Sequence, residues 1–218
     1  MKNSNPSGSG DTALTRIVTP LHGRYVFGRR VRRLAAHLAE LLPRNASVLD
    51  VGCGDGSLAK LIMDLRPDVT IRGIDLLVRP ATAIPVEAFD GVHMPAADGA
   101  YDVVMFVDVL HHTDDPWVLL REARRVARQC VLLKDHTADG WLSKPTLTFM
   151  DRVGNARHGV ALPFNYWTGE QWRRAFGELG LEIEVWRTEL GLYPAWANWL
   201  FGRSLHVIAR GRVVRSGG

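Results

Sequence analysis

The sequence is poor in cysteine, in lysine and in long apolar runs, and each scarcity excludes a class of protein. Two cysteines, Cys53 and Cys130, among 218 residues cannot build a disulfide-rich scaffold or a four-cysteine zinc cluster. No stretch approaches the roughly 20 consecutive apolar residues that a transmembrane helix needs. The first 11 residues are polar and lack the apolar core of a signal peptide. We therefore expect a cytoplasmic protein without a membrane span.

The positive charge is spread thinly along the chain. The net charge is +4, and only four of the 27 basic residues are lysines. The one dense basic run is formed by Arg24, Arg29, Arg30, Arg32 and Arg33. A basic balance of this kind can indicate nucleic acid. The polar face of a predicted helix carries part of this run, however, and a solvated helix face is the favoured explanation.

Apolar periodicity predicts an α/β fold in one domain. Residues 1–20 are rich in Ser, Gly, Asn and Pro and are expected to be a disordered tail, whereas residues 21–212 form the domain. Strands alternate with helices, which favours a mostly parallel sheet with helices on both faces, closed by an antiparallel pair. The predicted strands cover residues 47–51, 70–75, 86–89, 101–107, 130–134, 181–186 and 205–209. Helices are expected over residues 25–42, 57–65 and 117–127, and from the capping box at Thr168.

The alternation lapses over about residues 136–167, which are rich in Gly, Pro and aromatic side chains. A connection this long inside a compact domain is usually functional. We interpret it as a lid or acceptor-binding insertion. The polar residues in it that are first candidates for acceptor contact are Asp151, Asn155, His158, Asn165 and Tyr166.

A glycine-rich loop between the first strand and the next helix carries the main functional signal. Gly52, Gly54 and Gly56 allow a ligand to approach the backbone beside a helix N-terminus. Asp75 ends the following strand, where a carboxylate can accept hydrogen bonds from a ribose diol. The spacing G-x-G-x-G differs from the G-x-G-x-x-G of dinucleotide-binding folds, which disfavours a nicotinamide oxidoreductase. Asp50 and Asp55 further favour a cationic ligand over a pyrophosphate.

Four motifs in order resemble those of the class I S-adenosylmethionine-dependent methyltransferases. The first is Asp50-Val-Gly-Cys-Gly-Asp-Gly56, and the second is Gly73-Ile-Asp75. The third runs from Phe89 to Asp102 and includes an Asp-Gly-x-aromatic-Asp lead into a strand, and the fourth is the segment from Val103 to His112. The resemblance covers about residues 30–210. It implies a Rossmann-like, seven-stranded sheet whose last strand is antiparallel.

The resemblance also implies roles for individual residues toward S-adenosylmethionine, with S-adenosylhomocysteine as the product. Asp50 would support the amino group of the methionine part, and Asp75 would hold the ribose. Leu76 would pack on the adenine, and Asp90 would accept from its amino group. The remaining predicted cofactor contacts are Gly52, Cys53, Gly54, Gly56, Gly91, Val92, Val107 and His112.

Methyl transfer needs alignment of the acceptor, exclusion of water and, for an oxygen or nitrogen nucleophile, a proton acceptor. Such residues should follow the fourth and fifth strands, where His111, His112, Asp135, His136 and Asp139 lie. We predict His136, Asp135 and His112 as the catalytic set, with His136 as general base. A structural role for the same histidine remains an alternative. No metal is expected, because methyl transfer itself needs none.

The predicted activity is methylation of an oxygen or nitrogen of a small molecule by a monomer or homodimer. Nucleic acid is disfavoured as a partner, because neither cysteine follows a proline and no Asn/Asp-Pro-Pro-aromatic motif occurs. The alternatives are an RNA or protein methyltransferase, and a cofactor-binding partner subunit without activity of its own.

Overall fold

The structure, a computed structural model, describes residues 28–140, 143–148, 165–192 and 205–214. The predicted tail over residues 1–20 lies outside the described residues, as do residues 149–164 of the predicted insertion. Helices cover residues 28–41 and 143–148.

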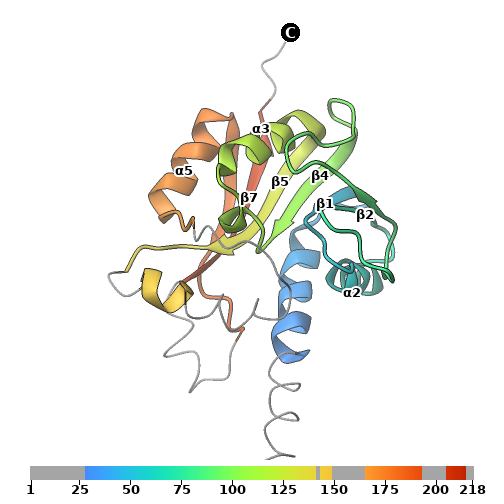
Figure 1. The fold of residues 1–218 in the computed structure, drawn as a ribbon, viewed down its shortest axis with the longest axis horizontal. Coiled ribbons are helices and arrows are strands. Elements are labelled where there is room, and N and C mark those ends of the chain that lie inside the picture. Colours follow the sequence, from blue (N-terminus) through green and yellow to red (C-terminus); the bar gives the residue numbers. More distant parts are fainter. Residues whose placement is uncertain (1–27, 141–142, 149–164, 193–204, 215–218) are drawn as a thin grey trace, which may run out of the picture.

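The centre of the molecule is a seven-stranded sheet in the order β3-β2-β1-β4-β5-β7-β6. Strands β1 to β5 pair in parallel, whereas β7 lies antiparallel between β5 and β6 (Figure 1). The predicted Rossmann-like α/β class and the antiparallel last strand are thereby confirmed. The strand bounds are β1 Ser47–Val51, β2 Thr70–Asp75, β3 Val86–Ala88, β4 Tyr101–Val107, β5 Ala127–His136, β6 Leu181–Arg187 and β7 His206–Val213.

Helices cover both faces of the sheet because alternate side chains of each buried strand point to opposite sides. On one face, α3 and α5 pack on Val104, Phe106 and Val131. On the other face, the helix over residues 28–41 and α2 pack on Val103 and Met105. The helical elements are α2 Ser57–Leu65, η1 Leu110–His112, α3 Pro116–Val126 and α5 Gly169–Glu178. None of the helices in the described part of the chain has both the length and the apolar character needed to cross a membrane.

Local sequence signals fix where these helices begin. Asp115 caps α3 by accepting from the Trp117 N–H, and Pro116 occupies the first turn, where its missing N–H costs nothing. The predicted capping box at Thr168 and Gln171 is present at the start of α5.

Strand β5 is longer than the sequence predicted, and this extension shapes the site. The prediction covered residues 130–134, whereas β5 runs through His136 because β7 pairs with it as far as His136 opposite His206. The register therefore holds Asp135 and His136 inside the sheet rather than at the start of a loop.

The two edges of the sheet carry different polar clusters. At the edge where β4 begins, Asp102 accepts from the Ser47 N–H, the Ser47 hydroxyl and the Arg128 and Gln129 side chains, which ties β1, β4 and β5 together. The opposite edge is formed by the carboxyl ends of the parallel strands. There the connection after β1 runs toward β2 and the connection after β4 runs toward β5, in opposite directions, and sheets of this kind bind ligands in the crevice between two such connections. The glycine-rich loop and the predicted catalytic residues lie at this carboxyl edge.

Two glycines give a matched test of the packing. Gly177 is exposed in α5 with no atom within 4 Å of an added Cβ, so Gly177→Ala should stabilise the protein by about 0.5–1 kcal/mol. Gly211 is buried in β7, where an added Cβ would lie 2.6 Å from the Phe176 ring, so Gly211→Ala should destabilise it by about 1–3 kcal/mol. Urea unfolding measures both changes. Equal effects of the two substitutions would contradict this packing.

Candidate active site

The glycine-rich loop is built from three residues in the left-handed region. Gly52, Gly54 and Gly56 have φ angles of 71°, 61° and 73°, which a side chain rarely tolerates. A Cβ on Gly52 would lie 2.7 Å from a methyl of Val109, whereas one on Gly54 would meet nothing within 4 Å. The backbone of Gly54 therefore faces open space at the carboxyl edge of the sheet, where a ligand can approach it.

Asp75 connects the end of β2 to this loop. One carboxylate oxygen accepts from the Gly54 N–H at 2.8 Å, and the other accepts from the Leu77 N–H at 2.9 Å. A carboxylate has about four acceptor positions, so these two bonds leave capacity for hydroxyl donors. The geometry suits the predicted contact of Asp75 with a ribose diol.

Asp50 lies buried behind the loop. Burial, together with the charge of Asp75, raises the pKa of Asp50 to about 7. A cationic group bound nearby would favour the ionised form of this carboxyl. Burial, with Asp50 as a further cause, also raises the pKa of Cys53 to about 12. The Cys53 thiol is therefore neutral near pH 7 and packs as a small side chain.

Apolar side chains lie exposed beside the same carboxylate. Leu76 is 67% exposed and Val92 is 44% exposed, and a Cβ on Gly91 would lie 2.9 Å from Leu76. Leu76 and Gly91 are thus neighbours, as the predicted adenine contacts require. Asp90 accepts from the His93 and Val92 N–H groups, and these bonds lower the pKa of Asp90 to about 2.

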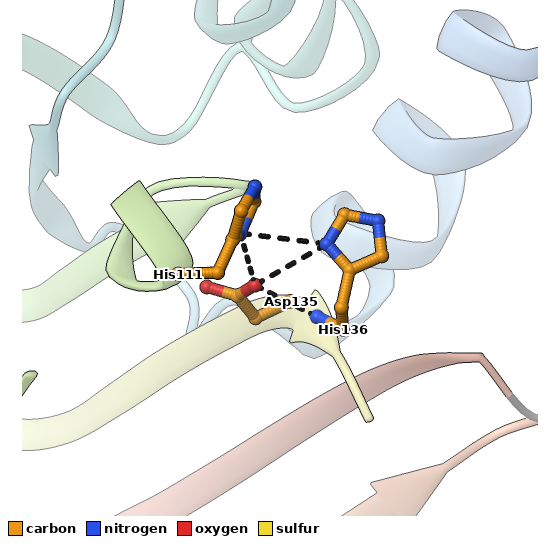
Figure 2. A group of neighbouring side chains, drawn as sticks. All are labelled: His111, Asp135 and His136. Atoms are coloured by element: carbon orange, nitrogen blue, oxygen red, sulfur yellow. Dashed lines mark hydrogen bonds and ion pairs between the residues drawn. The ribbon is translucent and has the colours of Figure 1, made fainter. Parts of the chain in front are cut away.

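Two of the predicted catalytic residues, Asp135 and His136, form a buried cluster with His111 (Figure 2). His111 comes from η1, after β4, and Asp135 and His136 end β5. The His111 Nδ1 lies 2.5 Å from Asp135 Oδ1, and the second oxygen of Asp135 accepts from the Leu110 N–H at 3.0 Å. The His136 Nδ1 lies 3.4 Å from His111 Nδ1 and 3.5 Å from Asp135 Oδ1. The ring of His112 is next to that of His111, with 3.9 Å between the centroids.

The charges of this cluster follow from its burial. Asp135 is 0% exposed, which by itself would raise the pKa of Asp135, but the His111 imidazole and the His136 ring hold that pKa well below its usual range. Burial also lowers the pKa of His136. Asp135 is therefore an anion paired with His111, and His136 is neutral near pH 7.

Two histidines and an aspartate are also a set that can ligate a metal, and their ligand atoms lie within 4.8 Å of one another. Two ligands of a tetrahedral zinc ion, each about 2.0–2.1 Å from the metal, are separated by roughly 3.3 Å. The separation of 2.5 Å between His111 and Asp135 is instead that of a strong, charge-assisted hydrogen bond. The geometry is that of a proton-sharing pair.

A second charged cluster adjoins the first. The buried ammonium group of Lys134 is paired with Asp108, which follows β4 with a φ angle of 57°. Arg30, on the helix over residues 28–41, contacts the other oxygen of Asp108 at 3.4 Å. His206 of β7 lies 3.5 Å from the Lys134 ammonium group.

Sequence reasoning missed Asp108, Lys134 and His206 as members of the site. Asp108 was detectable, because it directly follows the apolar run of β4, where the carboxyl ends of parallel strands meet. His206 gave no such signal, because its place depends on the antiparallel pairing of β7.

Residues after the insertion hold this cluster in position. The Asn165 N–H donates to the His111 carbonyl, and Tyr166 stacks on the His111 ring with 5.8 Å between centroids. The Trp172 indole donates to the His136 carbonyl. The candidate Asp139 accepts from the Gly169 N–H at the start of α5, a structural contact. The other predicted acceptor contacts, Asp151, Asn155 and His158, lie outside the described residues.

Comparison with known proteins shows to which family the chain belongs. The methyltransferase-domain family profile matches residues 22–185, which is most of the chain and includes the glycine-rich loop, Asp75 and the His111–Asp135 pair. The chain belongs to the class I S-adenosylmethionine-dependent methyltransferase family. The predicted family is thereby confirmed.

Individual relatives are similar over shorter spans. A 27-O-demethylrifamycin SV methyltransferase of Amycolatopsis mediterranei is 32% identical over 111 residues, which cover 44% of this chain and 40% of the relative. A ribosomal RNA-processing protein 8 of Caenorhabditis briggsae is 37% identical over 92 residues, 42% of this chain and 26% of the relative. The chain thus spans less than half the length of these relatives.

A solved structure supports the fold over a longer span. A chain in the complex of the Haloferax volcanii Trm112 methyltransferase activator with a methyltransferase superposes with a TM-score of 0.66 at 16% identity. The match covers 85% of this chain and 91% of that one.

The buried carboxyl of Asp50 predicts an unusual pH dependence of stability. An aspartate whose pKa rises on folding, here from 3.8 to about 7 for Asp50, binds more protons in the folded state between these two values. Its contribution therefore lowers the stability of the ligand-free protein as the pH rises from 4 to 7. Asp50→Asn should abolish this loss. Between pH 5 and pH 8, the free energy of unfolding of the variant should rise relative to that of the wild-type protein by up to about 3 kcal/mol. Urea unfolding at several pH values measures this gain, and a difference independent of pH would contradict it.

Proposed function

We propose that this protein binds S-adenosylmethionine and transfers its methyl group to an oxygen or nitrogen of a small molecule, most favourably a hydroxyl oxygen. The observation that carries the proposal is the buried His111–Asp135 pair, in which His111 follows β4 and Asp135 lies at the end of β5. This pair lies at the same edge of the sheet as the contact between Gly54 and Asp75, which we call the cradle. A histidine held by a buried carboxylate is a common arrangement for accepting a proton at neutral pH. Methylation of a hydroxyl needs such a group.

The residues of the cradle fit S-adenosylmethionine. Asp75 can accept from the ribose hydroxyls, and Gly54 leaves space beside the backbone. The buried carboxyl of Asp50 suits the cationic methionine part, because a nearby cation favours its ionised form. Leu76 and Val92 offer exposed apolar surface for the adenine ring. Gly52, Cys53, Gly56, Asp90, Gly91, Val107 and His112 remain the further proposed contacts.

The chain's own residues would supply alignment and proton transfer. When bound, S-adenosylmethionine supplies a methyl carbon activated by the adjacent sulfonium. Asp135 holds His111 through Nδ1, so Nε2 is the nitrogen that takes the proton from the acceptor. The negative charge of Asp135 then stabilises the imidazolium. His136 and His112 border this pair and shape its surroundings.

The geometry favours His111 over the sequence-based choice of His136 as the base. The Asp135 carboxylate is 2.5 Å from His111 Nδ1 but 3.5 Å from His136 Nδ1. Burial lowers the pKa of His136, and the longer hydrogen bond from its ring to Asp135 opposes this only in part. We therefore place His136 beside the base as a neutral neighbour.

Methylation of RNA is the second candidate, and similarity to a ribosomal RNA-processing protein favours it. The Haloferax volcanii complex likewise suggests, as a third candidate, that the protein acts together with a partner protein.

We expect mass spectrometry of the denatured protein to detect bound S-adenosylmethionine or S-adenosylhomocysteine. A screen of hydroxyl and amine compounds, with RNA in parallel, then follows release of S-adenosylhomocysteine. Turnover with RNA alone would replace the small-molecule proposal.

Asp75→Ala should raise the dissociation constant for S-adenosylmethionine about 10- to 100-fold, because charged hydrogen bonds to the ribose are lost at about 1.5–3 kcal/mol. Isothermal titration calorimetry measures the constant. Asp64→Ala is the matched control, because Asp64 is exposed and pairs with Lys60 on α2. Equal affinities for both variants would remove Asp75 from the cradle.

His111→Asn should lower kcat about 10²- to 10⁴-fold while the affinity for S-adenosylmethionine stays within a few-fold, because only the proton acceptor is lost. His37→Gln serves as the control, since His37 bonds the Leu190 carbonyl from the helix over residues 28–41. His136→Asn should lower kcat less than His111→Asn does. A larger loss in the His136 variant would restore His136 as the base.

A further inference from the structure

The structure contains a charge that neither the cofactor cradle nor the His111–Asp135 pair explains. Lys134 is completely buried in β5, where it follows the apolar residues Leu132 and Leu133 and directly precedes Asp135 of the site. A buried ammonium group is costly unless it is paired, and an apolar side chain at such a position is often as stabilising as the ion pair. The ion pair between Lys134 and Asp108 therefore calls for a functional reason.

Lys134 lies beside the His206 imidazole, and its partner Asp108 lies near the His136 imidazole. His206 Nδ1 is 3.5 Å from its ammonium group, and the rings of His206 and His136 are 4.9 Å apart. Asp108, the partner of Lys134, is 3.9 Å from His136 Nδ1. One ammonium group thus controls the electrostatic surroundings of both histidines.

We propose that Lys134 is a positioning residue of the methyl transfer, whose ammonium group, paired with Asp108, holds this carboxylate after β4 and keeps His136 and His206 neutral. The proton released by the acceptor then has one destination, the His111–Asp135 pair. The proposal rests on the proposed function for its kinetic readout only. The protonation of the imidazoles can be measured without any acceptor.

Within the described part of the chain, several charged or titratable groups surround these imidazoles, and the carboxylates among them oppose the effect of Lys134. The neighbours are Asp108 after β4, Lys134 and Asp135 on β5, His111 and His112 on η1, His206 on β7, Arg30 on the helix over residues 28–41, and Tyr166. Burial lowers the pKa of His206 well below its usual range, and Lys134 is the next cause. Burial also lowers the pKa of His136; the hydrogen bond to Asp135 opposes this lowering, and the charge of Lys134 adds to it.

Asp108 explains why the charge must be a cation rather than an apolar group. Burial would raise the pKa of Asp108, but Lys134, His136 and Arg30 hold that pKa well below its usual range. Without the ammonium group, the Asp108 anion would draw a proton onto a neighbouring imidazole. An imidazolium there would repel the proton that His111 must accept.

The experiment is an NMR titration of the histidine ring nitrogens from pH 5.5 to 9 in the full chain, with pH profiles of kcat/KM where an acceptor is known. In the wild-type protein, the His136 and His206 rings should stay neutral over this range. In Lys134→Met, at least one of them should become protonated with a midpoint at least one pH unit higher than in wild type. The pH at which kcat/KM falls on the acid side of its profile should rise together with this midpoint.

Three further variants separate the charge from the fold. Lys134→Arg keeps the charge and should restore neutral rings, and the double variant Asp108→Asn with Lys134→Met removes the anion and should do the same. Lys144→Met is the exposed control on the helix over residues 143–148. Neutral rings in Lys134→Met, or wild-type rings that titrate near the ordinary value of about 6.5, would overturn the proposal. If Lys134→Met does not fold, Lys134→Gln, which also removes the charge, is titrated in its place, and neutral rings in that variant would overturn the proposal. An inactive protein with the expected titrations would refute the proposed transfer and leave only the electrostatic role of Lys134 toward His136 and His206 intact.

Discussion

The buried carboxylate of Asp135 is the interaction on which the site depends. With no exposure to water, it remains charged only because donors from two different elements converge on it: the Leu110 N–H and the His111 ring after β4, and the His136 N–H at its own strand end. Removing these donors would leave an uncompensated charge in the core, which is strongly destabilising. The same bonds that make the carboxylate tolerable therefore orient the imidazole that we propose as the proton acceptor.

The cofactor cradle follows the same principle at a neighbouring strand. Asp75 binds the Gly54 N–H and so joins the end of β2 to the loop after β1. The loop can make this approach because its glycines adopt left-handed conformations. In both halves of the site, a carboxylate at a strand end fixes a loop that follows another strand, and the parallel sheet brings the two halves to one edge.

Much of this was predictable because the signals are local. The alternation of apolar runs predicted the strands, and the Thr168 capping box marked the start of α5. The glycine spacing, together with Asp75, predicted the cradle, because a glycine turn followed by a helix is determined mainly by residues that are close together in the sequence. The extension of β5 to His136 was not predictable, since it comes from pairing with β7 some seventy residues later. The same pairing brings His206 beside Lys134, which no spacing along the chain reveals.

The sequence by itself determined the fold class, the family motifs and the residues that can hold a nucleoside with a cationic group. Local backbone preferences and apolar periodicity are sufficient for these, because they act over a few residues. Only the tertiary structure decided which imidazole is paired with Asp135 and which charges surround it. Burial and distance set the protonation of a group, and both depend on side chains that meet from strands and helices far apart in the chain.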